Sequence, residues 1–188
     1  NMYGPTETTV WSTLKDLTNA EKITIGKPIA NTQIYILDKN MMLVPKGVAG
    51  DLYIGGEGLS PGYLGNEELT SKAFVPNPFV AGDTIYRTGD MAKWTSDGDI
   101  EFLGRSDFQV KVRGYRIELS EIEEKLRECE GVLECVVIVN ADKLGYNRLI
   151  AYYTSSIELD VKLLRKQLSE ELPDYMIPDI FVRIPAIP

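Results

Sequence analysis

The first seven residues gather several chemical groups on one short loop. The segment at 1–7 reads Asn-Met-Tyr-Gly-Pro-Thr-Glu, so it places an amide, an aromatic ring, a hydroxyl and a carboxylate around a Gly-Pro turn. Such a loop suits a planar base, a phosphate and a metal ion, because Mg²⁺ prefers carboxylate oxygens and shares its coordination with phosphates. Taken alone, the segment is equally typical of a capped turn.

Three further segments carry polar groups or unusual backbone. At 86–90 the chain reads Tyr-Arg-Thr-Gly-Asp, and an Asp in that position can accept two hydrogen bonds from a ribose diol, although a turn cap is the commoner role. Apolar and charged residues alternate over 104–119, which predicts a hairpin with a charged face. The glycine-rich segment at 50–64 indicates a bulged β structure whose backbone turns tightly or approaches another segment closely.

The composition excludes several kinds of chemistry. The chain has no histidine, so Ser-His-Asp and Cys-His catalysis are excluded and a zinc site is not expected. The 28 acidic residues outnumber the 20 basic ones, and the net charge of −8 argues against a nucleic-acid surface. Cys129 and Cys135 are expected to be reduced, packed thiols. No apolar run approaches a membrane span, so we expect no membrane association and a cytoplasmic protein.

The elements that must position these groups change in character along the chain. From 23 to 104 the signals are those of strands, and Asp97-Gly98 predicts a hairpin turn. Beyond 104 the pattern predicts capped helices: Ser120 with Glu123 as a capping box, and Asp160 as the N-cap of a second helix. The order β-α-β-β-α-β after the join near 105–107 suggests a small α+β unit behind a β-rich one.

In order and spacing, these segments resemble the core motifs of the adenylate-forming (AMP-binding) superfamily. The segments at 1–7 and 104–114 look most like the amino-acid adenylation domains of nonribosomal peptide synthetases, and Leu-Pro-Asp-Tyr-Met-Ile-Pro at 172–178 adds to the likeness. The resemblance covers essentially the whole chain. It implies a mixed fold, in which a β-rich, distorted barrel-like lobe at 1–106 ends the large subdomain and a small, mobile α+β lobe occupies 107–188.

By this resemblance the intact protein makes an aminoacyl-adenylate from ATP with Mg²⁺, a reaction that needs charge neutralisation and alignment. The implied catalytic residues are Thr6, which contacts the α-phosphate, and Glu7, which is also the metal ligand. Among the implied nucleotide contacts, Asn1 would bond the adenine edge, Tyr3 would stack on the adenine, and Phe102 would occupy a second adenine-facing position. Asp90 would accept from the ribose hydroxyls, with Arg105 assisting.

The second half-reaction is implied by the same resemblance. It loads the amino acid as a thioester on the phosphopantetheine of a peptidyl carrier domain, and the parent would also contain a condensation domain. Asp107 is expected at the hinge of the small lobe. The hairpin expected to approach the phosphopantetheine would contribute Lys111, Arg113 and Gly114, although plain surface charge remains an equal alternative for the first two.

Three residues of the substrate pocket are implied at Met2, Val10 and Trp11. None is charged, and two are large, so a small uncharged amino acid is expected, with glycine first and alanine second. The phosphate loop and most of the pocket are expected before Asn1 and the catalytic lysine after Pro188, so the fragment alone is expected to be inactive.

Several alternatives stay open on the sequence. The same fold serves free-standing acyl- or aryl-CoA ligases and D-alanine–carrier protein ligases. A chain of this kind could also be a non-catalytic module that only docks a carrier domain.

Overall fold

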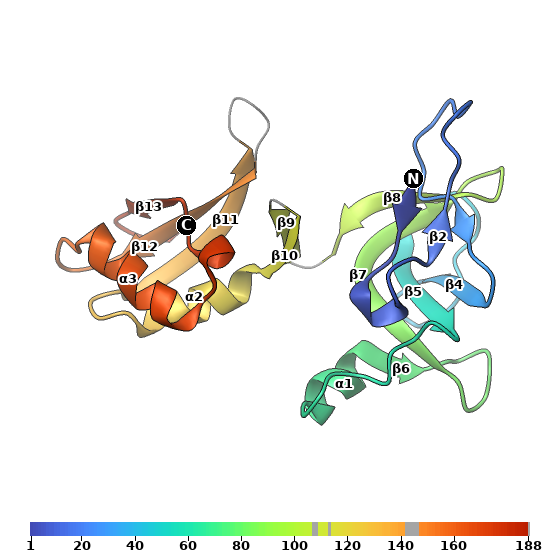
Figure 1. Ribbon diagram of the computed structural model, residues 1–188, viewed down its shortest axis with the longest axis horizontal. Coiled ribbons are helices and arrows are strands. Elements are labelled where there is room, and N and C mark those ends of the chain that lie inside the picture. The colour runs from blue at the N-terminus through green and yellow to red at the C-terminus, as the bar shows by residue number, and fades with distance from the viewer. Residues whose placement is uncertain (107–108, 113, 142–146, 188) are drawn as a thin grey trace. The chain divides into compact units, whose positions relative to one another are not determined.

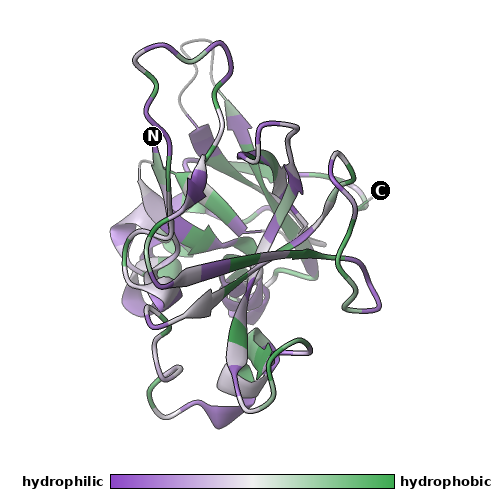
Figure 2. Cartoon of the chain, turned by 90° about the vertical axis from the view of Figure 1, so that its right-hand side faces the viewer, coloured by the Kyte–Doolittle hydropathy of each residue, from purple (hydrophilic) through white to green (hydrophobic). Residues whose placement is uncertain are grey.

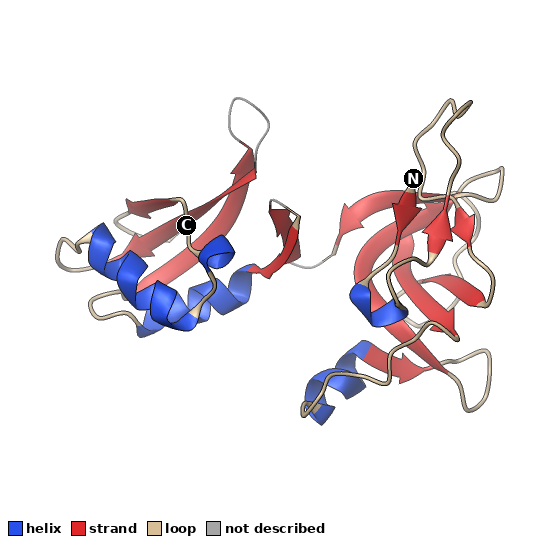
Figure 3. Ribbon diagram, viewed as in Figure 1, coloured by secondary structure: helices blue, strands red, loops and turns tan. Residues whose placement is uncertain are grey.

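The fold is described from a computed structural model that covers residues 1–106, 109–112, 114–141 and 147–187, apart from the Lys111 side chain. The chain divides into two compact units, Asn1–Asp107 and Phe108–Pro188 (Figure 1). Each sheet belongs to one unit (Figure 3). The mixed fold expected from the sequence, β-rich first and α+β second, is confirmed. No helix among the described residues is long and apolar enough to cross a membrane.

A five-stranded antiparallel sheet forms the body of the first unit. Its strands are β4 (Thr32–Leu37), β5 (Gly50–Gly56), β6 (Phe74–Pro76), β7 (Thr84–Trp94) and β8 (Ile100–Arg105). The order is β4-β5-β7-β6, and β8 pairs with the same long β7 farther along it. One helix, α1 (Glu67–Ala73), precedes β6 and is capped by the Asn66 side chain.

Both faces of this sheet are covered by apolar side chains. Ile36, Leu52 and Ile100 lie in one buried cluster, whereas Tyr53 and Ile85 lie in another. Neighbouring residues Leu52 and Tyr53 thus point to opposite faces, as the two-residue period of a strand requires. Figure 2 shows hydrophobic stretches along the strands, whereas hydrophilic and hydrophobic stretches alternate in the long loop near the N-terminus.

A small three-stranded antiparallel sheet, β1-β2-β3, carries the N-terminal segment. It consists of β1 (Met2–Tyr3), β2 (Thr13–Leu14) and β3 (Lys27–Pro28), with the 3₁₀ helix η1 (Thr6–Thr8) between the first two. A bridge between Gly26 and Ile100 joins this region to β8. The predicted hairpin at Asp97-Gly98 is confirmed, because it connects β7 to β8 and Gly98 has a φ of +77°.

The second unit combines a sheet with two helices. The hairpin β9 (Gln109–Val112) and β10 (Tyr115–Glu118) leads into α2 (Leu119–Glu128). The sheet β11-β12-β13 follows, made of β11 (Glu134–Ala141), β12 (Asn147–Thr154) and β13 (Ile180–Arg183), with α3 (Val161–Glu171) and the 3₁₀ helix η2 (Asp174–Met176) between the last two strands. Both helices and the sheet contribute to one buried cluster.

The two predicted helix starts have different outcomes. Asp160 is the N-cap of α3, and its side chain accepts a hydrogen bond from the Lys162 amide at 2.8 Å, as predicted. The capping box at Ser120 is wrong, because the N-cap of α2 is Glu118, two residues earlier, and it makes no side-chain cap bond. The Glu123 carboxylate instead accepts from the Val137 amide at 2.8 Å and so ties the helix to β11.

The glycine-rich segment at 50–64 approaches another segment closely, as the sequence predicts. Gly56 has a φ of +108°, and a Cβ placed there would lie 2.1 Å from the Asn31 carbonyl oxygen. Gly65 also has a positive φ, +70°, but a Cβ there would meet no atom of the described residues within 4 Å. Substitution of Gly65 would therefore introduce backbone strain alone, whereas substitution of Gly56 would introduce both backbone strain and steric overlap.

Gly56→Ala should lower the free energy of unfolding of the first unit by roughly 2–5 kcal/mol, since a left-handed backbone and an overpacked contact both contribute. Gly65→Ala, with the backbone strain alone, should cost roughly 1–2 kcal/mol. Both tryptophans of the chain, Trp11 and Trp94, belong to the first unit, so their fluorescence during urea unfolding reports this unit separately. Equal effects of the two substitutions would contradict the steric explanation.

Candidate functional site

A buried carboxylate joins three of the segments that the sequence singled out. Asp90 lies on β7 directly opposite Arg105 on β8, and the Arg105 Nη1 donates to Asp90 Oδ1 at 2.7 Å. The Tyr3 hydroxyl donates to Asp90 Oδ2 from the N-terminal sheet. Only 5% of Asp90 is exposed, so these charge-assisted hydrogen bonds fix the carboxylate in place.

Thr88 helps to fix the position of Asp90. The Thr88 hydroxyl accepts from the Asp90 amide at 3.0 Å and donates to the Leu52 carbonyl at 2.8 Å. Arg105 Nη2 donates to the Thr88 carbonyl at 3.1 Å. Thr88 lies inside the 86–90 segment, but its role was not predicted, because its partner Leu52 is 36 residues away.

Two aromatic rings lie beside this cluster. The ring centroids of Tyr3 and Phe102 are 6.2 Å apart at an interplanar angle of 40°, so the rings do not stack on each other. Burial, and after it the negative charge of Asp90, raises the pKa of the Tyr3 hydroxyl. Tyr3 therefore remains a neutral donor. The predicted residues Tyr3, Asp90 and Arg105 are joined by hydrogen bonds, and Phe102 lies beside Tyr3.

The turn after Tyr3 holds a second buried acid. Glu7 in η1 is 7% exposed, and its Oε1 accepts from the Tyr63 hydroxyl at 2.7 Å. Burial, and after it the hydrogen bond to Glu7, raises the pKa of Tyr63. Thr6, the other predicted catalytic residue, lies exposed on the same turn. Tyr63 was missed by the sequence analysis, which treated its segment as structural.

The three predicted pocket residues are all exposed in this chain. The exposed fractions are 51%, 64% and 54% for Met2, Val10 and Trp11. Thr9 and Val10 have φ values of +59° and +68°, and the Trp11 amide donates to the Thr9 carbonyl at 2.8 Å. A tight turn of this kind is strained for a β-branched residue, and such strain is concentrated at functional sites.

Gly4 packs beneath this strained turn. A Cβ on Gly4 would lie 2.5 Å from the Val10 carbonyl oxygen, so the turn approaches the Gly-Pro step without room for a side chain. Asn1 lies outside these clusters, since its side-chain amide donates to the Thr24 carbonyl at 2.7 Å.

The predicted hinge and hairpin residues belong to a different part of the chain. Asp107 and Arg113 lie outside the described residues, as does the side chain of Lys111, whose backbone pairs with Arg116. Gly114, with a φ of +86°, makes the turn between β9 and β10. This left-handed conformation favours glycine.

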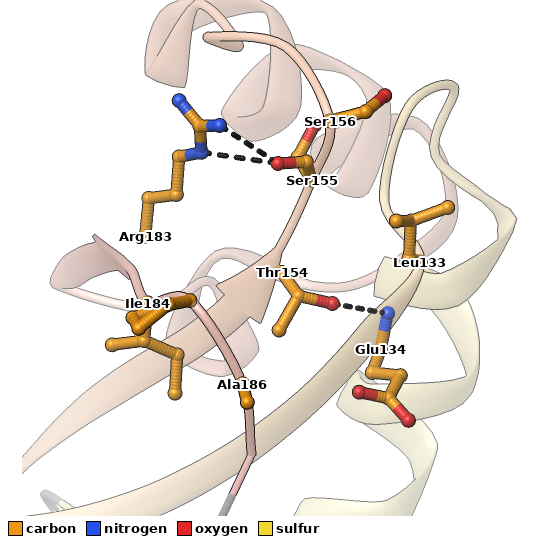
Figure 4. A pocket seen from close by; sticks show the side chains of 9 residues that line it. Leu133, Glu134, Thr154, Ser155, Ser156, Arg183, Ile184 and Ala186 are labelled. Atoms are coloured by element: carbon orange, nitrogen blue, oxygen red, sulfur yellow. Dashed lines mark hydrogen bonds between the residues drawn. The ribbon is translucent and has the colours of Figure 1, made fainter.

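Two pockets lie away from the predicted residues. The first, of 690 Å³, is in the second unit, where Arg183 donates twice to the Ser155 carbonyl and the Glu134 amide donates to the Thr154 hydroxyl (Figure 4). The second, of 490 Å³, is in the first unit and is lined by Tyr53 and Arg87 among others. Neither is lined by a predicted site residue, although Arg87 of the second pocket belongs to the 86–90 segment.

Comparison with known proteins gives matches over both units. The family described as AMP-binding enzyme matches residues 1–64, and the AMP-binding enzyme C-terminal domain matches residues 121–188. Gramicidin S synthase 2 of Brevibacillus brevis is 50% identical over 191 residues, which cover 100% of this chain and 4% of that protein. The chain thus spans a small part of the curated relative.

The chain is also similar over its whole length to solved structures of nonribosomal peptide synthetases. The chain is similar to PA1221, a nonribosomal peptide synthetase protein with adenylation and PCP domains, with 33% identity, a TM-score of 0.84, and coverage of 100% of this chain and 38% of that one. It is also similar to AB3403, a four-domain nonribosomal peptide synthetase bound to AMP and glycine, with 47% identity, a TM-score of 0.54, and coverage of 100% and 14%.

Proposed function

The chain belongs to the AMP-binding enzyme family, and from that membership we propose that it forms part of an amino-acid adenylation domain in a nonribosomal peptide synthetase. Residues 1–106 would end the large subdomain, and residues 107–188 would form the small mobile one. The observation that carries the proposal is the cluster of Tyr3, Asp90 and Arg105, which assembles a fixed carboxylate and an aromatic ring from separate segments. The 50% identity to gramicidin S synthase 2 supports this function over that of a free-standing ligase or a non-catalytic module.

The proposed reaction joins an amino acid to AMP. A carboxylate oxygen of the amino acid attacks the α-phosphorus of ATP, and pyrophosphate leaves with the electron pair of the broken P–O bond. Asp90 would accept hydrogen bonds from the ribose hydroxyls, because a carboxylate has about four acceptor sites and can serve both protein and ligand donors. Tyr3 and Phe102 would face the adenine, Asn1 would bond its edge, and Arg105 would hold Asp90.

The residues around the phosphates must stabilise negative charge. Thr6 would donate a hydrogen bond to the α-phosphate, since it is an exposed residue of the turn. Among the described residues, no three acidic, cysteine or histidine side chains converge, so Glu7 would be a single carboxylate ligand. That donor set suits Mg²⁺, which keeps several waters and is usually held by one or two carboxylates together with substrate phosphates. When bound, Mg²⁺ neutralises phosphate charge.

The second half-reaction would transfer the aminoacyl group to a thiol. The thiol of a phosphopantetheine on a carrier domain attacks the acyl carbon, and AMP leaves. Lys111, Arg113 and Gly114 would approach the phosphopantetheine after the small subdomain swings about Asp107. A carrier domain and a condensation domain are the proposed partners, and the proposed location is the cytoplasm, where ATP is available to such an enzyme.

The form of the thioester product tests this proposal. With ATP and the amino acid, the complete protein should load the phosphopantetheine of a carrier domain, and the mass of the carrier should increase by one aminoacyl group. Free coenzyme A should remain unmodified in the same mixture. A coenzyme A thioester as the main product would instead identify an acyl-CoA ligase.

The substrate is proposed to be a small uncharged amino acid, with glycine favoured. Met2, Val10 and Trp11 carry no charge, so no group among them could pair with an ionised side chain. AB3403, which is 47% identical, is a synthetase bound to AMP and glycine. In a complete domain, Trp11 would fill the volume that a larger side chain needs.

Trp11→Ala should therefore broaden the substrate range. In a complete domain the ratio of kcat/KM for leucine to that for glycine should rise at least tenfold, since hydrophobic pocket contacts discriminate by about 10–200-fold. The matched control is Ile23→Ala, which trims another exposed apolar side chain outside the predicted pocket and should leave the ratio unchanged. A parent domain that prefers lysine, glutamate or tryptophan would contradict the substrate proposal.

A further inference from the structure

The glycine-rich segment after β5 lies directly against the turn that carries Glu7. The Ser60 amide donates to the Glu7 carbonyl at 2.9 Å, and the Thr9 hydroxyl donates to the Gly58 carbonyl at 2.7 Å. A Cβ on Gly58 would lie 3.0 Å from the Thr8 carbonyl oxygen. The segment and the turn are thus in contact along residues 7–9, and the small residues of the segment permit this approach.

The same segment also reaches the Glu7 carboxylate. The Tyr63 hydroxyl donates to Glu7 Oε1 at 2.7 Å, and this carboxylate is almost fully buried. A buried charge is costly unless it is hydrogen-bonded, and a hydrogen bond to an ionised acceptor is stronger than one between neutral groups. Tyr63 therefore contributes both to keeping the carboxylate in its buried position and to setting its direction.

Tyr63 is itself held by elements other than the turn. Its backbone amide donates to the Thr70 hydroxyl on α1 at 2.9 Å. Its ring packs edge-on against Phe74 of β6, with the ring centroids 5.8 Å apart. The direction of the hydroxyl is therefore fixed by α1 and the five-stranded sheet, whereas the acid that it contacts belongs to the N-terminal segment.

We propose that Tyr63 is a positioning residue for Glu7, held by α1 and β6 so that its hydroxyl aims the carboxylate toward the cation that accompanies ATP. This inference rests on the proposed function and deepens it, because it gives the glycine-rich segment a role in the reaction. Tyr63 acts only through Glu7.

Tyr63→Phe in the complete adenylation domain tests the proposal, because it removes the hydroxyl and keeps the ring. Binding of Mn²⁺ in the presence of ATP, measured from the loss of the free-ion electron paramagnetic resonance signal, should weaken about 10–100-fold, the usual effect of losing a partner of a metal ligand. The matched control is Tyr53→Phe, which removes the hydroxyl of a tyrosine buried beside Ile85 in the five-stranded sheet. It should leave Mn²⁺ binding unchanged.

Glu7→Gln separates failure of this inference from failure of the proposed function. If Glu7→Gln weakens Mn²⁺ binding and Tyr63→Phe does not, the positioning role is wrong and the proposed function stands. If Glu7→Gln also binds Mn²⁺ like the parent, the proposed metal role of Glu7 is wrong and the positioning role falls with it. In the double variant, the positioning role predicts no further weakening beyond Glu7→Gln alone, whereas fully additive effects would overturn it.

Discussion

Asp107→Pro in the complete adenylation domain should leave adenylate formation measurable and suppress thioester formation. Proline fixes φ near −65°, so a pivot at this residue could no longer adopt two backbone conformations. The boundary between the two compact units of the chain falls after Asp107, the residue that the family resemblance implies as the hinge. In the proposed reaction, adenylation would need one pose of the small subdomain and thiolation another, so only the second half-reaction would depend on the change of pose.

Separate assays of the two half-reactions check this result. Amino-acid-dependent exchange of pyrophosphate into ATP measures the first, and transfer of radiolabelled amino acid to the carrier domain measures the second. Asp107→Ala is the control, because it removes the carboxylate but leaves φ free, and it should retain both activities better than the proline variant. An equal loss of both half-reactions in Asp107→Pro would point to a folding defect or a nucleotide contact and would contradict the hinge.

Asp90→Ala should weaken the use of ATP by roughly 1.5–3 kcal/mol, the usual contribution of hydrogen bonds to a charged group, which corresponds to about ten- to a hundredfold in apparent affinity. The substitution also leaves Tyr3 and Arg105 without the acceptor that now joins them. Asp90→Asn retains one acceptor oxygen and the shape of the side chain, so its effect should be smaller.

The apparent KM for ATP in the pyrophosphate exchange assay measures this effect. The matched control is Glu101→Gln, an acid on the same pair of strands whose carboxylate contacts Lys93 at 3.3 Å and is more exposed than Asp90. It should leave the KM for ATP unchanged. An unchanged KM in Asp90→Ala would remove this residue from the nucleotide site.

The elements that sequence patterns predicted well are those decided by local chemistry. The Asp97-Gly98 turn depends on backbone conformation, and the Asp160 cap depends on a side chain that accepts from the amide two residues later. The local sequence therefore contains what is needed to predict both. The capping box at Ser120 depended on where Glu123 would point. Its carboxylate accepts a hydrogen bond from the Val137 amide on β11, and a local sequence pattern cannot predict a partner so far along the chain.

The residues of the candidate site were also predicted better than the contacts between them. The motifs predicted that Tyr3, Asp90 and Arg105 would share a nucleotide site, but not that they would bond to one another. Those bonds depend on the register of β7 and β8, which shifts at a bulge between Met91 and Ala92. The link from Tyr63 to Glu7 spans 56 residues and depends on how α1 and β6 hold the tyrosine, which glycine spacing does not reveal.

Pyrophosphate exchange by the complete domain that contains this chain tests the central claim most directly. With Mg²⁺, ATP and radiolabelled pyrophosphate, we expect label in ATP only when an amino acid is added, with small uncharged amino acids giving the largest signal. Exchange that ignores every amino acid but responds to fatty or aromatic acids would contradict the assignment to amino-acid activation.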